Sequence, residues 1–218
     1  MSWEQELKQG FAIVVDIGKT MSKVSLWSRD ELCLEKLTRP NQTPPVEGPA
    51  VLDTLATGEW LKTALASFAD HPVEAIIPVA HGAAVAGIRD DALAFVPLDY
   101  EWEIPPAMAA AYKAQRDPFS VTGSPSLPAG LNIGSQLDWL EHQGALNGVT
   151  LVPYAQYWAW FLSGVATSEV TSLGCHSDLW SPASAGFSPM AHRRGWAERF
   201  APLALAGEVI GTLRPELA

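Results

Sequence analysis

The residues with the clearest chemical potential lie in one short segment near the N-terminus, Asp16-Ile-Gly-Lys-Thr-Met-Ser-Lys23. Asp16 follows an apolar run, and a carboxylate held at the end of a buried strand can organise Mg²⁺ through water. Gly18 permits a tight turn, so the backbone N–H groups of Lys19 and Thr20 can face an anion, and Lys19 and Lys23 add positive charge. The segment lacks the second glycine of a P-loop. Its spacing alone predicts either a phosphate-binding turn with a metal-organising aspartate or an ordinary hairpin with two solvated lysines.

The elements that must hold this segment follow from the hydrophobic pattern. Phe11–Val15 is a continuous apolar run, which is typical of a buried central strand. Residues 17–20 form a turn, and the alternation in Lys23–Trp27 predicts a second strand that pairs with the first. Further strands are predicted at Glu31–Leu37, Glu74–Val79 and Ala83–Ile88, with a helix at Asp53–Asp70. Three strands, a helix and then more strand predict a mixed α/β fold with an antiparallel opening.

The rest of the chain is predicted to alternate between long loops and short helices. Thr38–Pro49, which contains four prolines, and Pro118–Asn132 are expected to be loops. Helices are predicted at Ala107–Ala114, Gly134–Gln143 and Tyr154–Leu162. Gly164 ends the last of these helices, whose aromatic side chains are expected to pack in the core. His176 and Asp178 form either a catalytic dyad or loop-fixing hydrogen bonds, and we favour the loop-fixing role.

Composition limits the class of protein. The 218 residues are 48% hydrophobic and 17% charged, which is typical of a soluble globular chain. Fourteen basic and 24 acidic residues give a net charge of −10, so nucleic acid and anionic membranes are not expected partners. His192-Arg193-Arg194 is the one basic cluster, and it is predicted to be a solvated surface turn.

Cysteine content and the N-terminus indicate the compartment. Cys33 and Cys175 are too few for a disulfide scaffold and are expected to stay reduced. Met1–Gly10 has no apolar core of a signal peptide, and no stretch approaches the roughly 18 consecutive apolar residues of a membrane helix. We therefore expect a cytoplasmic protein.

The Asp-Ile-Gly-x-Thr-x-x-Lys pattern between two strands resembles the first phosphate loop of the superfamily that contains sugar kinases, actin and Hsp70. Within it, the chain resembles the FGGY family of carbohydrate kinases. Further blocks that resemble the family follow in the family's order: Val79–Val85, Val96–Trp102, Leu151–Gly164, Ser168–Trp180 and Leu203–Ala218. The resemblance implies a ribonuclease-H-like α/β fold, a mixed sheet flanked by helices, and ATP with Mg²⁺ as cofactors.

The chain departs from the family pattern at three points. Lys19 stands where a threonine or serine is common, and the segment around Asp99-Tyr100-Glu101-Trp102 lacks an arginine that many members carry. The combination looks most similar to the branch that acts on L-rhamnulose or L-fuculose. Kinases of this family are also about twice as long, with two similarly folded domains. Residues 1–218 therefore resemble the N-terminal domain alone, without the nucleotide-binding domain that carries the general base.

The resemblance also assigns roles to sugar-binding candidates. His81 can donate and accept hydrogen bonds, and Gly82 admits close approach; the alternative is a turn histidine bonded to backbone. Asp99 and Glu101 can bind neighbouring hydroxyls while Tyr100 stacks on the sugar ring; the alternative is a solvated acidic loop.

The sequence thus predicts half of an ATP-dependent kinase that phosphorylates a ketose or deoxyketose hydroxyl. Asp16 would organise Mg²⁺, and Gly18, Lys19, Thr20 and Lys23 would hold the phosphates. No catalytic base is expected in this chain, so little activity is expected from it alone. The alternatives are a non-catalytic sugar-binding or assembly module, and one half of a split kinase. A complementary domain or chain is the expected partner, and a homo-oligomer is a further option.

Overall fold

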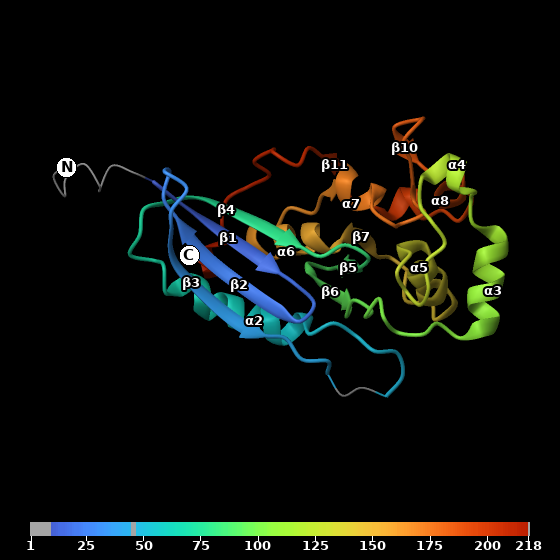
Figure 1. Ribbon diagram of the computed structural model, residues 1–218, viewed down its shortest axis with the longest axis horizontal. Helices are drawn as coiled ribbons and strands as arrows, with labels where there is room; N and C mark the ends of the chain where they lie inside the picture. The colour runs from blue at the N-terminus through green and yellow to red at the C-terminus, as the bar shows by residue number, and fades with distance from the viewer. Residues whose placement is uncertain (1–9, 45–46, 218) are drawn as a thin grey trace.

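A four-stranded sheet at one end of the molecule contains the segment that the sequence singled out (Figure 1). The computed structural model describes residues 10–44 and 47–217. The strand order is β3-β2-β1-β4, formed by β1 (Phe11–Ile17), β2 (Met21–Trp27), β3 (Cys33–Pro40) and β4 (Val73–Ala80). β1, β2 and β3 pair antiparallel, whereas β4 lies parallel to β1. The mixed sheet and antiparallel opening are therefore confirmed.

Alternation along the strands explains how the sheet is held. Ile13, Val15 and Ile17 of β1 point into the core and are at most 3% exposed. Val24 and Leu26 of β2 lie beside them in the register and are also buried. Helices α2 (Thr54–Ala66) and α6 (Tyr154–Ser163) pack against the strands and complete this core.

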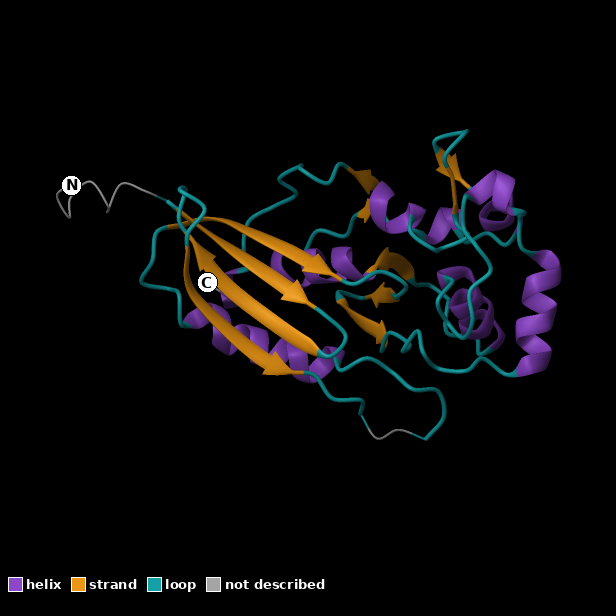
Figure 2. Ribbon diagram, viewed as in Figure 1, coloured by secondary structure: helices purple, strands orange, loops and turns teal. Residues whose placement is uncertain are grey.

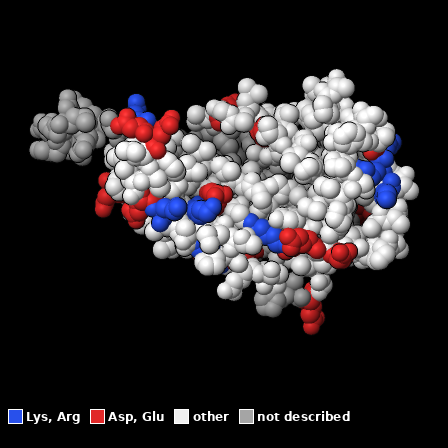
Figure 3. Space-filling model, in the orientation of Figure 1, with Lys and Arg blue, Asp and Glu red and all other residues white. Residues whose placement is uncertain are grey.

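The opposite face of the sheet is open and carries both apolar and charged side chains, because Asp16 lies beside Val79 and Lys23 in the register. The pairing places Val14 of β1 next to Ile77 of β4, and Ile77 and Val79 are 48% and 46% exposed. Figure 2 shows the sheet from this side, with α6 behind it. In the space-filling view the same face is mainly uncharged, and the basic groups lie next to acidic ones (Figure 3).

A second, smaller sheet connects the first one to the helical end of the molecule. It has the order β6-β5-β7, formed by β5 (Val85–Arg89), β6 (Ala92–Phe95) and β7 (Thr150–Pro153). β7 runs directly into α6, and α6 ends at Gly164, whose φ of 81° is the left-handed conformation that favours glycine. The buried aromatic residues of α6 confirm the predicted core role of this helix.

The helical end contains short elements around a second hydrophobic cluster. Its helices are α3 (Pro106–Gln115), α4 (Phe119–Thr122), α5 (Ile133–His142), α7 (Val170–Gly174) and α8 (Pro189–Arg193). Two-stranded pairs join β8 (Ser168–Glu169) with β11 (Leu203–Ala204) and β9 (Trp180–Ser181) with β10 (Gly186–Phe187). Single 3₁₀ turns, η1 (Ala197–Arg199) and η2 (Pro215–Leu217), complete the described chain. No described helix has the length and apolar character needed to cross a membrane.

Several predicted boundaries were wrong. Residues 38–40 belong to β3 rather than to the proline-rich loop, because Arg39 pairs with β2 through Ser22. The helix predicted to reach Asp70 ends at Ala66, since the next residues form tighter turns in which the Phe68 N–H donates to the Leu65 carbonyl. β6 and β7 are short and carry weak alternation, and the sequence analysis missed both.

The basic cluster at residues 192–194 lies at the surface, as predicted, with His192 and Arg193 exposed. It lies at the end of α8, and its arginines are paired rather than free. Arg193 bridges Asp117 at 3.1 Å, and Arg194 bridges Asp138 at 2.7 Å and stacks over Trp196. The cluster therefore combines exposed basic side chains with ion pairs to acidic residues of neighbouring segments.

Candidate functional site

The turn between β1 and β2 needs its glycine. The Gly18 N–H donates to the Met21 carbonyl at 3.0 Å, and a Cβ at Gly18 would lie 2.8 Å from that carbonyl oxygen. Among the described residues, the N–H groups of Lys19 and Thr20 donate to no protein acceptor. Two adjacent free N–H groups at the tip of a tight turn are donors suited to an anion.

Asn41 anchors this turn, a role that the sequence analysis missed. Its side-chain amide donates to the Gly18 carbonyl at 2.8 Å, and its Oδ1 accepts a hydrogen bond from Arg39 at 2.8 Å. Arg39 also bridges Asp53, at the start of α2, at 2.7 Å. The turn is thus tied to a helix through two side chains of β3 and the following loop. The only available sequence signal was the proline-rich segment Thr38–Pro49, which was predicted to be a loop.

Asp16 and Lys23 face each other across the hairpin. The register pairs the two residues, and the Lys23 ammonium lies 2.9 Å from the Asp16 carboxylate. Their side chains are 42% and 41% exposed, so both can reach a ligand from solvent. No group of three or more metal-ligating side chains gathers within residues 10–44 and 47–217. Mg²⁺ requires only one or two carboxylates when substrate phosphates and water complete its shell, so Asp16 fits that ion.

Lys19 turns away from the hairpin toward the segment after β6. Its ammonium lies 2.8 Å from Asp99 and 2.5 Å from Glu101. It also lies over the Tyr100 ring, 4.8 Å from the centroid. Burial alone would lower the pKa of Lys19, but hydrogen bonds to Asp99 and Glu101 outweigh this effect and raise it. Two of the departures from the family pattern, at position 19 and in the 99–102 segment, therefore contact each other.

His81 contacts both the hairpin and the acidic segment Asp99–Glu101. Its backbone N–H donates to the Ile17 carbonyl, which ties the end of β4 to the end of β1. Its ring lies 5.3 Å from the Tyr100 ring and 5.0 Å from the Tyr154 ring, between centroids. Nδ1 is 2.8 Å from the Gly82 carbonyl, so in the neutral ring Nδ1 donates and Nε2 remains an acceptor. Burial lowers the pKa of His81 and favours that neutral form.

This pKa shift predicts a pH effect on stability. The folded state binds a proton on His81 less readily than the unfolded state does, so protonation of His81 favours unfolding. The free energy of unfolding should therefore be highest above pH 6.5, the ordinary pKa of histidine, and should decrease as the pH falls below that value. His81→Gln should reduce the loss between pH 6.5 and 5, measured by urea unfolding at several pH values. Equal pH dependence in the two proteins would show that His81 is not held neutral.

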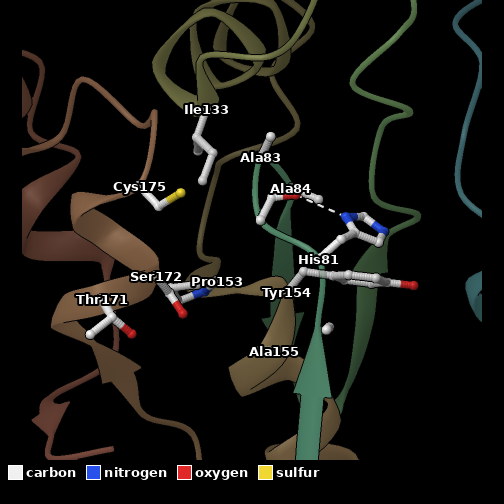
Figure 4. A pocket seen from close by; sticks show the side chains of 12 residues that line it. His81, Ala83, Ala84, Ile133, Pro153, Tyr154, Ala155, Thr171, Ser172 and Cys175 are labelled. Carbon is white, nitrogen blue, oxygen red and sulfur yellow. Dashed lines mark hydrogen bonds between the residues drawn. The ribbon is translucent and has the colours of Figure 1, made fainter. Parts of the chain in front are cut away.

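A cavity of about 200 Å³ opens beside His81 (Figure 4). His81 and Tyr154 line one side, and Thr171, Ser172 and Cys175 from α7 and the residues after it line the other. The cavity thus has hydroxyl, thiol and imidazole groups within a small volume.

The cavity wall includes a strained residue. Ala83 has a φ of 57°, which is unusual for a residue with a Cβ. Its carbonyl accepts a hydrogen bond from the buried Gln136 side chain at 2.7 Å, and Gln136 also donates to Gly130 at 2.6 Å. This support from α5 stabilises the turn that follows His81.

Most predicted site residues come together, and Asp178 has the structural role that the sequence analysis favoured for it. Salt bridges and ring contacts link the hairpin, His81 and the 99–101 segment, although these segments are far apart in sequence. Asp178 is fully buried and accepts hydrogen bonds from Arg116 and Tyr112, which supports the loop-fixing role over a catalytic dyad with His176. Tyr154 beside His81 was not predicted, since the helix pattern assigned its aromatic residues to the core.

Comparison with solved structures gives the class of protein. The chain matches a carbohydrate kinase from Novosphingobium aromaticivorans with a TM-score of 0.93 and 56% sequence identity. The match covers 96% of this chain and 45% of that kinase. The chain is thus similar in fold and sequence to part of a carbohydrate kinase, and it spans less than half the length of that kinase.

More distant structures agree on the fold. The chain matches a xylulose kinase from Lactobacillus acidophilus (TM-score 0.81, 14% identity, 95% of this chain and 44% of that one). It also matches a glycerol kinase from Plasmodium falciparum solved with ADP (TM-score 0.75, 9% identity, 96% and 46%). No protein-family model and no curated protein matched the chain. The solved structures confirm the resemblance to the FGGY family of carbohydrate kinases, while the L-rhamnulose or L-fuculose branch stays a prediction.

Proposed function

We propose that this chain is the N-terminal, sugar- and phosphate-binding half of an ATP-dependent carbohydrate kinase. The supporting observation is the contact between two segments that would bind different substrates. The hairpin with Asp16 meets the segment Asp99–Glu101 directly through Lys19, and His81 lies between them. A site that transfers a phosphoryl group to a sugar needs phosphate-binding groups next to hydroxyl-binding groups.

The phosphate part of the proposed site is the hairpin. Gly18 forms the turn, and the N–H groups of Lys19 and Thr20 would donate to phosphate oxygens. Lys23 would add charge after leaving Asp16, whose carboxylate would then hold Mg²⁺ through water. The bound ion would neutralise the charge that develops on the transferred phosphoryl group.

The sugar part of the proposed site lies between His81 and the acidic segment. Nε2 of His81 is free to accept a hydrogen bond from a hydroxyl, and exposed Gly82 leaves room for the ligand. Asp99 and Glu101 offer carboxylate acceptors, and Tyr100 offers a ring face for stacking. These acceptors suit a neutral polyhydroxylated substrate such as a ketose or deoxyketose.

The isolated chain should have little kinase activity. The chain spans less than half the length of the carbohydrate kinase it matches, and phosphoryl transfer depends on positioning between two sides of a cleft. The purified 218-residue chain should bind a ketose by calorimetry and release ADP no faster with sugar than without it. Sugar-dependent ADP release by the chain alone would contradict this expectation. Failure to bind any of D-xylulose, L-rhamnulose, L-fuculose or glycerol would contradict the sugar site.

A split kinase is the second candidate, and exposed apolar side chains on the open face of the sheet favour it. Ile77 and Val79 are about half exposed, although both have the residue type of a packed interior. A second chain that covers this face and carries the general base would restore ADP release on mixing. If a single longer chain supplies that half, mixing with separately expressed proteins would change nothing and the full-length protein would be active.

A further inference from the structure

The side chain of Lys19 binds the acidic segment Asp99–Glu101. Its ammonium contacts two carboxylates, 2.8 Å from Asp99 and 2.5 Å from Glu101, and lies over the ring of Tyr100. An ammonium has three N–H donors, and the contacts with the two carboxylates occupy at least two of them, so little hydrogen-bonding capacity remains for another anion. The neighbouring Lys23 behaves differently, because it pairs with Asp16 on the hairpin itself.

Burial strengthens the ion pair between Lys19 and Asp99. The side chains of Lys19 and Asp99 are only 18% and 8% exposed, so their attraction is weakly screened by solvent. Breaking the pair would leave Asp99 as an uncompensated charge in a nearly buried position, which is costly. Asp99 is further fixed because its Oδ1 accepts a hydrogen bond from the Glu101 N–H at 2.8 Å. The ammonium, the carboxylates and the backbone turn therefore form one rigid unit.

We propose that Lys19 is, through its side chain, a positioning residue for the sugar, and that its ammonium does not bind the nucleotide phosphates. Its ammonium neutralises Asp99 and orients Asp99 and Glu101 so that both accept hydrogen bonds from hydroxyls of a neutral polyhydroxylated ligand. The inference rests on the proposed function, because it requires that this segment binds sugar. It assigns the two lysines of the hairpin to different substrates: Lys23 serves the phosphates and Lys19 serves the sugar.

Calorimetry with two kinds of probe separates these roles. The 218-residue chain is titrated with D-xylulose, L-rhamnulose and L-fuculose, and separately with inorganic pyrophosphate in the presence of Mg²⁺. Lys19→Met should weaken sugar binding by roughly tenfold, the effect of losing one charge-assisted hydrogen bond, and leave pyrophosphate binding within about twofold. Lys23→Met should give the reverse pattern. Lys19→Arg, which keeps a cation able to contact both carboxylates, should retain most of the sugar affinity.

Two further variants keep the test decisive. Glu101→Gln changes an exposed side chain and should leave the fold intact while weakening sugar binding, even if Lys19→Met unfolds the chain. Lys62→Met removes a comparable lysine–glutamate pair on α2, remote from the site, and should change neither titration. The inference would be wrong, without affecting the proposed function, if Lys19→Met or Lys19→Arg lost pyrophosphate binding. It would also be wrong if Lys19→Met and Glu101→Gln both kept full sugar affinity. A wild-type chain that binds none of the three sugars would overturn the proposed function and the inference together.

Discussion

Asp16→Asn should reduce phosphoryl transfer by the full-length protein roughly a thousandfold, the scale seen when one group that stabilises transition-state charge is removed. Asp16 is the carboxylate of the hairpin, and its side chain is half exposed at the end of a rigid strand. Asparagine keeps the shape and a hydrogen-bonding oxygen but loses the charge that would attract Mg²⁺. The rate of sugar-dependent ADP release at several Mg²⁺ concentrations measures the effect.

A matched control comes from the other end of the sheet. Asp30 lies exposed in the turn between β2 and β3, so Asp30→Asn removes the same charge from the chain without touching the hairpin. It should leave the rate unchanged. If Asp16→Asn kept more than about a tenth of the activity, the metal-organising role of Asp16 would be wrong, since a charge-stabilising group contributes more than that.

Asp178→Ala should lower the free energy of unfolding by about 3–5 kcal/mol, the cost of removing one partner from a buried ion pair. Asp178 is fully buried and receives hydrogen bonds from Arg116 at 2.5 Å and from Tyr112 at 2.7 Å. Burial, followed by the nearby Asp178 charge, raises the pKa of Tyr112, so its hydroxyl stays protonated and donates. Without the carboxylate, the Arg116 charge and the Tyr112 hydroxyl lose their common acceptor. Urea unfolding followed by tryptophan fluorescence measures the loss.

Two comparisons isolate the buried pair. Asp178→Asn keeps an acceptor and suits the φ of 66° at this position, because asparagine tolerates the left-handed conformation, so it should destabilise less than alanine. Glu59→Ala removes an exposed partner of Lys62 on α2 and should change the free energy of unfolding little. Similar losses in Asp178→Ala and Glu59→Ala would mean that the Arg116–Asp178 pair does not hold the helical end together.

Local pattern was enough for the elements around the hairpin. The strands at Phe11 and Lys23 and the turn at Gly18 were predicted because alternation and glycine act over a few residues. The end of the helix near Ala66 and the short strands β6 and β7 were not, because weak local signals are decided by packing.

The candidate site shows the same division. The residue types can be read directly from the sequence: Asp16 after a buried strand, a lysine on each side of Thr20, and two carboxylates around Tyr100. Spacing within the hairpin suggested one common role for both lysines, because neighbours in sequence were assumed to share a ligand.

Which of these groups contact each other depends on how distant segments pack. The parallel pairing of β1 with β4 brings His81 to the hairpin, and the packing of α6 brings Tyr154 to His81. The same arrangement places the 99–101 segment within reach of Lys19, which separates the two lysines between two substrates in the proposed site. Contacts between distant segments depend on burial and pairing across the whole sheet, and no local spacing encodes them.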